Sequence, residues 1–157
     1  MARQGLVNAE ERAAAVFYVG NRDHLAWPAV ELLTGLRRNL LDRLRAELRD
    51  WRPRPVHASL FGSAARGDGD AGSDIDILVI RPETVGEDES PWSDQVDRLR
   101  DQVRAWSGNN CQVFQVDPSR LAQHVRARDR LVEDWLRDGI TVAGPDLRAI
   151  LPDYEVR

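Results

Sequence analysis

The sequence predicts an α+β fold in which a small mixed β-sheet has helices packed on one face. The 157 residues fit one ordinary domain. Their shares of hydrophobic residues (42%) and charged residues (31%) are typical of globular proteins with a core of their own. Amphipathic helical stretches and short apolar strands follow one another in the order α-β-β-α-β-α, which is typical of an α+β arrangement.

The first 26 residues are expected to form a β-hairpin. Two short apolar runs, at residues 5–7 and 14–19, flank a polar turn around residues 8–12. A short helix over residues 9–18 is the alternative, because three consecutive alanines also suit a helix. We therefore separate residues 1–26 from a domain at 27–157.

A long amphipathic helix is predicted over Trp27–Trp51. Leucines recur every four residues from Leu32 to Leu48, with arginines between them, and Pro28 suits the first helical turn. Strands are expected next at residues 56–61, 73–81, 111–116 and 140–142. Helices are expected at residues 91–106 and 118–138, with a short helix at 145–151. Residues 62–72 should form a glycine-rich loop or a helical turn, and residues 83–90 a charged loop.

Composition excludes several classes of protein. One cysteine cannot form an internal disulfide, and three histidines do not complete a structural zinc site with it. No apolar run approaches the ~18–20 residues of a membrane span. The first eight residues lack the apolar core of a signal peptide. A cytoplasmic location without membrane contact is therefore expected.

The charge balance restricts the ligands. All 22 basic residues are arginine, and the net charge is −4, with an isoelectric point near 5.4. A protein that coats a polyanion normally has a basic surface, so DNA binding by this chain alone is not expected. An anionic ligand must be held locally, by arginine, by backbone amides or through a divalent cation.

Two carboxylates are the first candidate site. Alternate side chains of a strand share a face, so Asp74 and Asp76 should project together while Ile75 and Ile77 face the core. Paired carboxylates repel each other without a cation and suit Mg²⁺, which prefers oxygen ligands. Taken alone, the pair is equally compatible with two ordinary solvated acids.

The residues before this strand point to phosphate. Gly62 lets the backbone approach a ligand closely, and Ser63 offers a hydroxyl and an amide. Arg66 adds a charge that can bind phosphate or shield a metal site, and Gly67 turns the chain. A plain glycine-serine turn explains part of this segment but not all of it.

Seven residues together resemble the signature of the minimal nucleotidyltransferases of the DNA polymerase β superfamily, which include kanamycin nucleotidyltransferase-like proteins. They are Gly62, Ser63, Arg66, Gly67, Ser73, Asp74 and Asp76. The resemblance covers about residues 56–121 and implies a nucleotidyltransferase fold. It implies that the first five bind the nucleotide. It also implies that Asp74 and Asp76 are catalytic and hold one or two Mg²⁺ ions.

The resemblance implies an enzyme that transfers a nucleoside monophosphate, with AMP from ATP as the expected group. The acceptor would be a hydroxyl of a protein or of a small molecule such as an aminoglycoside. The alternative is a catalytically weakened nucleotide-binding sensor, or a partner-binding module of a regulator or toxin-antitoxin system.

One feature departs from the family pattern. Sites of this kind take a third carboxylate from a neighbouring strand, expected here at Phe114 or Gln112, and neither is acidic. Asp117 is the nearest carboxylate, but it lies at the strand end with the opposite parity. An amide cannot act as a general base, so the departure favours the sensor alternative.

The N-terminal hairpin also resembles the wing of a winged helix-turn-helix domain, without the recognition helix. A plain hairpin or helix that packs on the domain is the alternative. An isolated two-stranded hairpin is marginal in water, and its apolar residues (Val7, Val16 and Tyr18) need cover. We therefore expect residues 1–26 to contribute to a homodimer.

Overall fold

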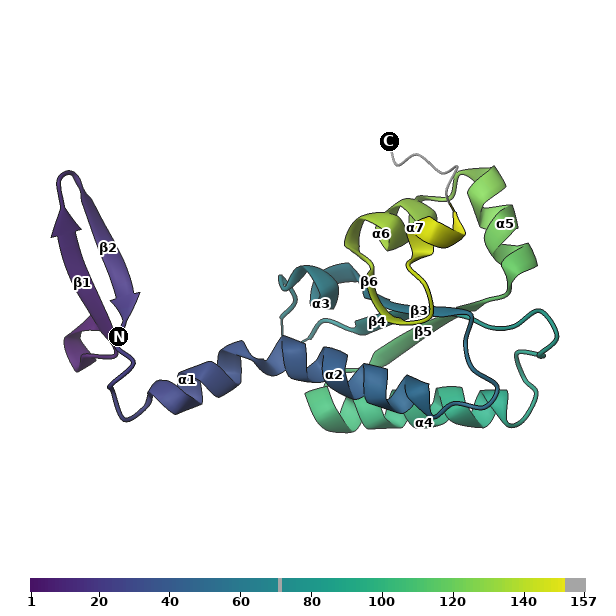
Figure 1. Ribbon diagram of the computed structural model, residues 1–157, viewed down its shortest axis with the longest axis horizontal. Coiled ribbons are helices and arrows are strands. Elements are labelled where there is room, and N and C mark those ends of the chain that lie inside the picture. Colours follow the sequence, from purple (N-terminus) through teal and green to yellow (C-terminus); the bar gives the residue numbers. More distant parts are fainter. Residues whose placement is uncertain (71, 152–157) are drawn as a thin grey trace. The chain divides into compact units, whose positions relative to one another are not determined.

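The computed structural model describes residues 1–70 and 72–151 (Figure 1). By its internal contacts the chain divides into two compact units, Met1–Arg38 and Asn39–Arg157. Within the described residues, no helix is both long enough and apolar enough to cross a membrane.

The first unit contains the predicted hairpin. After a 3₁₀ turn, η1 (Ala2–Gln4), the strands β1 (Val7–Arg12) and β2 (Ala15–Gly20) pair antiparallel. This confirms the hairpin and excludes the helix over residues 9–18. None of residues 1–38, all of which the structure describes, is buried.

The predicted long helix is wrong in one respect, because the structure has two helices, α1 (Trp27–Thr34) and α2 (Leu36–Arg49). They are separated at Gly35, which has no side chain to favour the helix over other conformations. The Thr34 hydroxyl also donates to the carbonyl oxygens of Val30 and Glu31, as such residues do near helix ends. Leucine spacing alone did not reveal this break.

The second unit is built on a four-stranded mixed sheet in the order β5-β4-β3-β6. The strands are β3 (His57–Phe61), β4 (Ile75–Ile80), β5 (Cys111–Val116) and β6 (Ile140–Ala143). β4 and β5 are parallel, and the other neighbours are antiparallel. The α+β class, the mixed sheet and the four strands are therefore confirmed, with bounds that shift by at most two residues.

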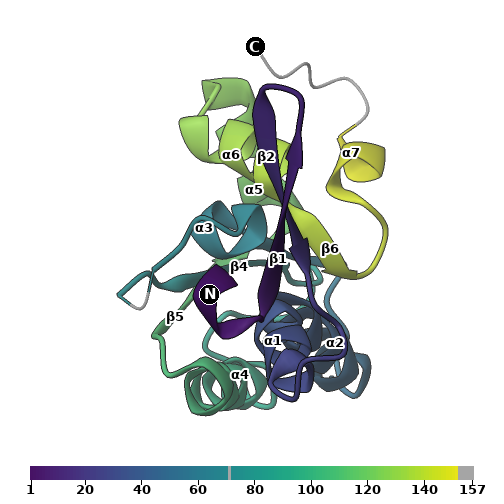
Figure 2. The ribbon, with the colours of Figure 1, turned by 90° about the vertical axis from the view of Figure 1, so that its left-hand side faces the viewer.

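Helices cover both faces of this sheet, which corrects the expectation of one face (Figure 2). α2 and α4 (Trp92–Ser107) pack on one face, against residues such as Leu60 and Ile77. The opposite face packs on α5 (Pro118–Ala127), α6 (Arg130–Asp138) and α7 (Leu147–Ile150). β4 is apolar at nearly every position, as in strands buried on both faces.

The predicted helix over residues 118–138 is also two helices. Arg128 takes a left-handed conformation (φ 53°) and ends α5. Asp129 then caps α6 by accepting a hydrogen bond from the Leu131 amide, and its carboxylate also binds His124. An Asp at an N-cap is a standard helix start, so Asp129 was the signal for a second helix. The turn lets α6 fold back over the sheet.

Candidate functional site

The site begins where β3 ends. A single helical turn, α3 (Gly62–Arg66), follows Phe61 without a loop and ends at Gly67 in a left-handed conformation (φ 81°). This confirms the helical turn expected in the glycine-rich segment, of which Ala71 lies outside the described residues. α3 contacts β3, β4 and α6, so Ser63 is held above the start of β4.

Gly62 is required by its conformation and by its neighbour. Its φ of +70° lies in the region that favours glycine. A β-carbon added there would lie 2.6 Å from Asp76 Oδ2. The missing side chain therefore lets the Asp76 carboxylate lie directly against the backbone at the start of α3.

The structure brings Asp74, Asp76 and Gln112 together. In the sheet register Asp76 lies between Phe61 on β3 and Gln112 on β5, so these side chains share a face. Gln112 Nε2 lies 3.5 Å from Asp74 Oδ2. Of the two positions considered for the third carboxylate, Gln112 is thus the one beside the pair.

The Asp76 carboxylate is short of compensating charge. Partial burial raises the pKa of Asp76, and the neighbouring charge of Asp74 raises it further. Among residues 1–70 and 72–151, none donates a hydrogen bond to this carboxylate. A cation between Asp74 and Asp76 would offset both the burial of the Asp76 carboxylate and its repulsion by Asp74.

These groups fit a divalent cation incompletely. Two carboxylates and the amide oxygen of Gln112 are oxygen ligands of the kind that Mg²⁺ takes. Within the described part of the chain, however, no group of three or more acidic, histidine or cysteine side chains could hold a metal ion. Asp74 and Asp76 would therefore hold Mg²⁺ together with oxygens from a bound phosphate.

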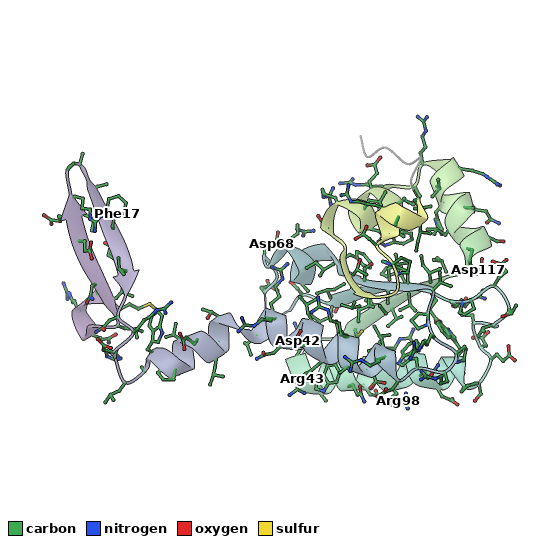
Figure 3. All side chains as sticks on the ribbon, viewed as in Figure 1. Phe17, Asp42, Arg43, Asp68, Arg98 and Asp117 are labelled. Carbon is green, nitrogen blue, oxygen red and sulfur yellow. The ribbon has the colours of Figure 1, made fainter. Side chains whose placement is uncertain are left out.

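Asp117 does not substitute for the missing acid. Its carboxylate accepts hydrogen bonds from Arg81 (2.6 Å) and from the amide of Arg120, so it caps α5. It lies at the opposite end of the second unit from Asp68, the residue just after α3 (Figure 3). Phe114 faces the same side as Gln112 but packs on Phe61, with ring centroids 5.5 Å apart.

Arg66 is engaged by two carboxylates. It bonds Asp68 at 3.0 Å and Asp138 at 2.7 Å, and the Asp138 side chain is only 5% exposed. Hydrogen bonds from Arg137 and Arg66 hold the pKa of Asp138 below its usual range. Asp138 thereby ties α3 to α6, which sequence reasoning missed because the two residues are 72 positions apart. A direct role of Arg66 toward phosphate stays a prediction.

Ser73 shapes the loop before β4. Its hydroxyl donates to Asp70 Oδ1 and accepts from the Asp70 amide, both at 2.9 Å. The Ser73 hydroxyl is the leading cause that lowers the pKa of Asp70. Asn109 Nδ2 donates to the Ser73 carbonyl (2.8 Å), a contact that the sequence did not indicate. Ser73 therefore fixes where Asp74 enters the site.

Cys111, at the start of β5, is not a nucleophile in this structure. Burial raises the pKa of its thiol to about 12, and the nearby charges of Asp76 and Asp74 act in the same direction. Because the thiolate is the reactive form, Cys111 is inert at neutral pH.

The close approach of Gly62 to Asp76 predicts a specific cost. Gly62→Ala should destabilise the protein by more than Gly108→Ala. Both replace a glycine at positive φ, at a cost of about 1–2 kcal/mol, but Gly108 has no atom within 4 Å of an added β-carbon. Urea unfolding should show at least about 1 kcal/mol of additional loss for Gly62→Ala. Equal losses would mean that Asp76 does not depend on this contact.

Several known proteins are similar to this chain. The family model described as nucleotidyltransferase domain matches residues 41–138. One similar solved structure is a toxin-antitoxin with AMP-PNP (20% identity, TM-score 0.45), whose likeness covers 72% of this chain and 77% of that one. Another is a mutant of the toxin-antitoxin MntA-HpeT (16% identity, TM-score 0.47), with coverage of 71% and 78%. No curated protein sequence matches the chain.

The family model spans well over half of the 157 residues and includes the glycine-serine turn and both aspartates. The motif resemblance is therefore confirmed. The chain belongs to the nucleotidyltransferase domain family and is a nucleotidyltransferase.

Proposed function

We propose that this enzyme transfers a nucleoside monophosphate, AMP from ATP, to a hydroxyl acceptor with the help of Mg²⁺. The observation that carries the proposal is the placement of Asp76 against the turn at Gly62, with Asp74 Oδ2 3.5 Å from Gln112 Nε2 on the neighbouring strand. A nucleoside triphosphate would need both the glycine-serine turn and the two carboxylates. The turn would bind its phosphates, and the carboxylates would hold the cation that offsets their negative charge.

Each residue has a role in this proposal. Gly62 and Ser63 would bind the triphosphate, since the backbone is uncovered at Gly62 and Ser63 adds a hydroxyl. Asp74 and Asp76 would hold Mg²⁺, which supplies positive charge at the reacting phosphate. Gly67 and Ser73 would set the shape of the loop between them.

The reaction follows from this placement. The acceptor oxygen forms a bond to the α-phosphorus while the bond from that phosphorus to the bridging oxygen breaks. Pyrophosphate leaves with the electron pair, and the hydroxyl proton passes to solvent. Gln112 lies beside Asp76, at one of the two positions where the family pattern would put a third carboxylate, and a neutral amide cannot take that proton. The chemistry would therefore be slow for this family.

Loss of either carboxylate should weaken nucleotide binding. We expect Asp74→Asn and Asp76→Asn each to reduce Mg²⁺-dependent ATP affinity roughly tenfold or more, about 1.4 kcal/mol, because each removes a charge that holds the cation. Both variants should remain folded, since the repulsion between the two acids is relieved. Calorimetry with and without Mg²⁺ measures this. Asp97→Asn, on the exposed face of α4, is the matched control, and unchanged affinity in both site variants would disprove the site.

Gln112 favours the second candidate function, a nucleotide-binding sensor with little or no transfer. The two candidates are separated by restoring the acid. Gln112→Asp should raise Mg²⁺-dependent pyrophosphate release from ATP if the chain is an enzyme that lacks one ligand. Gln123→Asp, on the exposed face of α5, should leave the rate unchanged. Tight ATP binding without release of pyrophosphate in either protein would establish the sensor.

Residues 1–26 are proposed to contribute to a homodimer. β2 carries no charge, and Val16, Phe17, Tyr18 and Val19 are 47–68% exposed. Pairing of two copies along β2 would continue the sheet with apolar neighbours, whereas the charged β1 edge would bring glutamates together.

The molar mass of the protein in solution tests whether it forms this dimer. Light scattering at micromolar concentration should give a dimer for the full chain and a monomer after deletion of residues 1–26. Phe17→Lys should act like the deletion, because it places two positive charges near each other at the shared edge. A monomeric full chain, or a dimer that survives the deletion, would contradict this proposal.

A further inference from the structure

A hollow of about 270 Å³ lies beside β5 in the second unit. Phe114, His124, Leu131 and Trp135 are among the residues that line it. Phe114 projects from the sheet face that also carries Asp76 and Gln112, and it is two residues further along β5 than Gln112. This spacing is roughly 7 Å along a strand. The near edge of the hollow, at Phe114, therefore lies two residues along β5 from Gln112, on the face that carries Asp76.

Three of the residues that line the hollow are aromatic, Phe114, His124 and Trp135. Phe114 is 37% exposed, although its neighbours on this face, Leu78 and Val116, are at most 5% exposed. The rings of His124 and Trp135 lie edge to face, with centroids 5.9 Å apart. Aromatic rings pack favourably in both offset and edge-to-face geometry. The exposed ring of Phe114 is thus suited to another aromatic ring.

The charges at this hollow do not suit a polycation. Its one acidic residue, Glu87, lies 3.7 Å from Arg120, which also lines the hollow. The two charges largely compensate each other. An aminoglycoside carries several ammonium groups and would need several carboxylates. An aromatic ligand therefore fits this hollow better than an aminoglycoside does.

The position of the hollow indicates which substrate it receives. In the strand order, β4 lies between β3, which leads into Gly62 and Ser63, and β5, which carries Phe114. In phosphoryl transfer the attacking and leaving oxygens are roughly in line across the phosphorus. If pyrophosphate leaves on the side of Ser63, the acceptor hydroxyl must enter from the side of β5.

We infer that this hollow is the acceptor pocket and that the acceptor is a small aromatic alcohol whose ring packs on Phe114. The inference rests on the proposed function, because the triphosphate position defines the direction of attack. The ring would pack on Phe114, the exposed aromatic residue of the lining, because Trp135 is only 2% exposed. The hydroxyl would point past Gln112 to the phosphorus held above Asp74 and Asp76, and it would give up its proton to solvent as pyrophosphate leaves.

Binding is tested first, without nucleotide. In ¹⁵N–¹H spectra, the Trp135 indole signal, assigned with Trp135→Phe, should shift saturably as benzyl alcohol is added, with a Kd of roughly millimolar for so small a ligand. Glucosamine, which is a six-membered ring with hydroxyls and an ammonium group, should cause no shift. Phe114→Ala should weaken binding about threefold to tenfold, and Leu32→Ala, at an exposed leucine of α1, should not. Phe114→Leu, which keeps an apolar side chain, tests the ring if the alanine variant unfolds.

The second experiment tests the acceptor role. With Mg²⁺ and ATP present, benzyl alcohol should still bind and should raise pyrophosphate release, and Phe114→Leu should reduce that stimulation without changing ATP affinity. Displacement of benzyl alcohol by Mg²⁺-ATP would place the nucleobase in the hollow and overturn the inference. No shift of Trp135, or binding without stimulation in both the natural chain and Gln112→Asp, would also overturn it. Failure of the proposed function can be told apart from failure of this inference. If the proposed function fails, Mg²⁺-dependent ATP binding is absent, while the Trp135 titration with benzyl alcohol can still be measured.

Discussion

The contact between the Asp76 carboxylate and the backbone at Gly62 is the constraint on which the site depends. The positive φ of Gly62 favours glycine and starts α3 without a loop, and the absent side chain leaves room for Asp76 Oδ2, which would lie 2.6 Å from an added β-carbon. Ser63 is positioned by the same turn. One close approach thus places the proposed phosphate-binding residues directly over the carboxylates.

This arrangement concentrates negative charge. The neighbouring charge of Asp74 and partial burial both raise the pKa of Asp76, while the nearest arginine of the motif, Arg66, is bonded to Asp68 and Asp138. Arg66 therefore secures α3 to α6. A cation bound at Asp74 and Asp76, as proposed, would supply the charge that compensates these two carboxylates.

The neighbouring strand decides how far the chemistry can go. β5 runs parallel to β4 in a register that puts Gln112 beside Asp76 and Phe114 two pairs further along. An amide at the first position lowers the power of the site to remove a proton, and an exposed ring at the second opens an aromatic hollow beside it. The same strand thus carries both the neutral amide beside Asp76 and the exposed ring that lines the hollow.

The sequence by itself predicted the strands of the sheet and the pairing of Asp74 with Asp76, because periodicity and the Gly62-to-Asp76 motif are local signals, and it left a hairpin and a short helix open for residues 9–18. The breaks at Gly35 and Arg128 went unpredicted, since the apolar spacing continues across both. Only the tertiary structure showed that both sheet faces are covered and that Asp138 holds Arg66. It also distinguished Gln112 from Phe114 as the neighbour of Asp76, because strand register and long-range ion pairs depend on how distant segments pack.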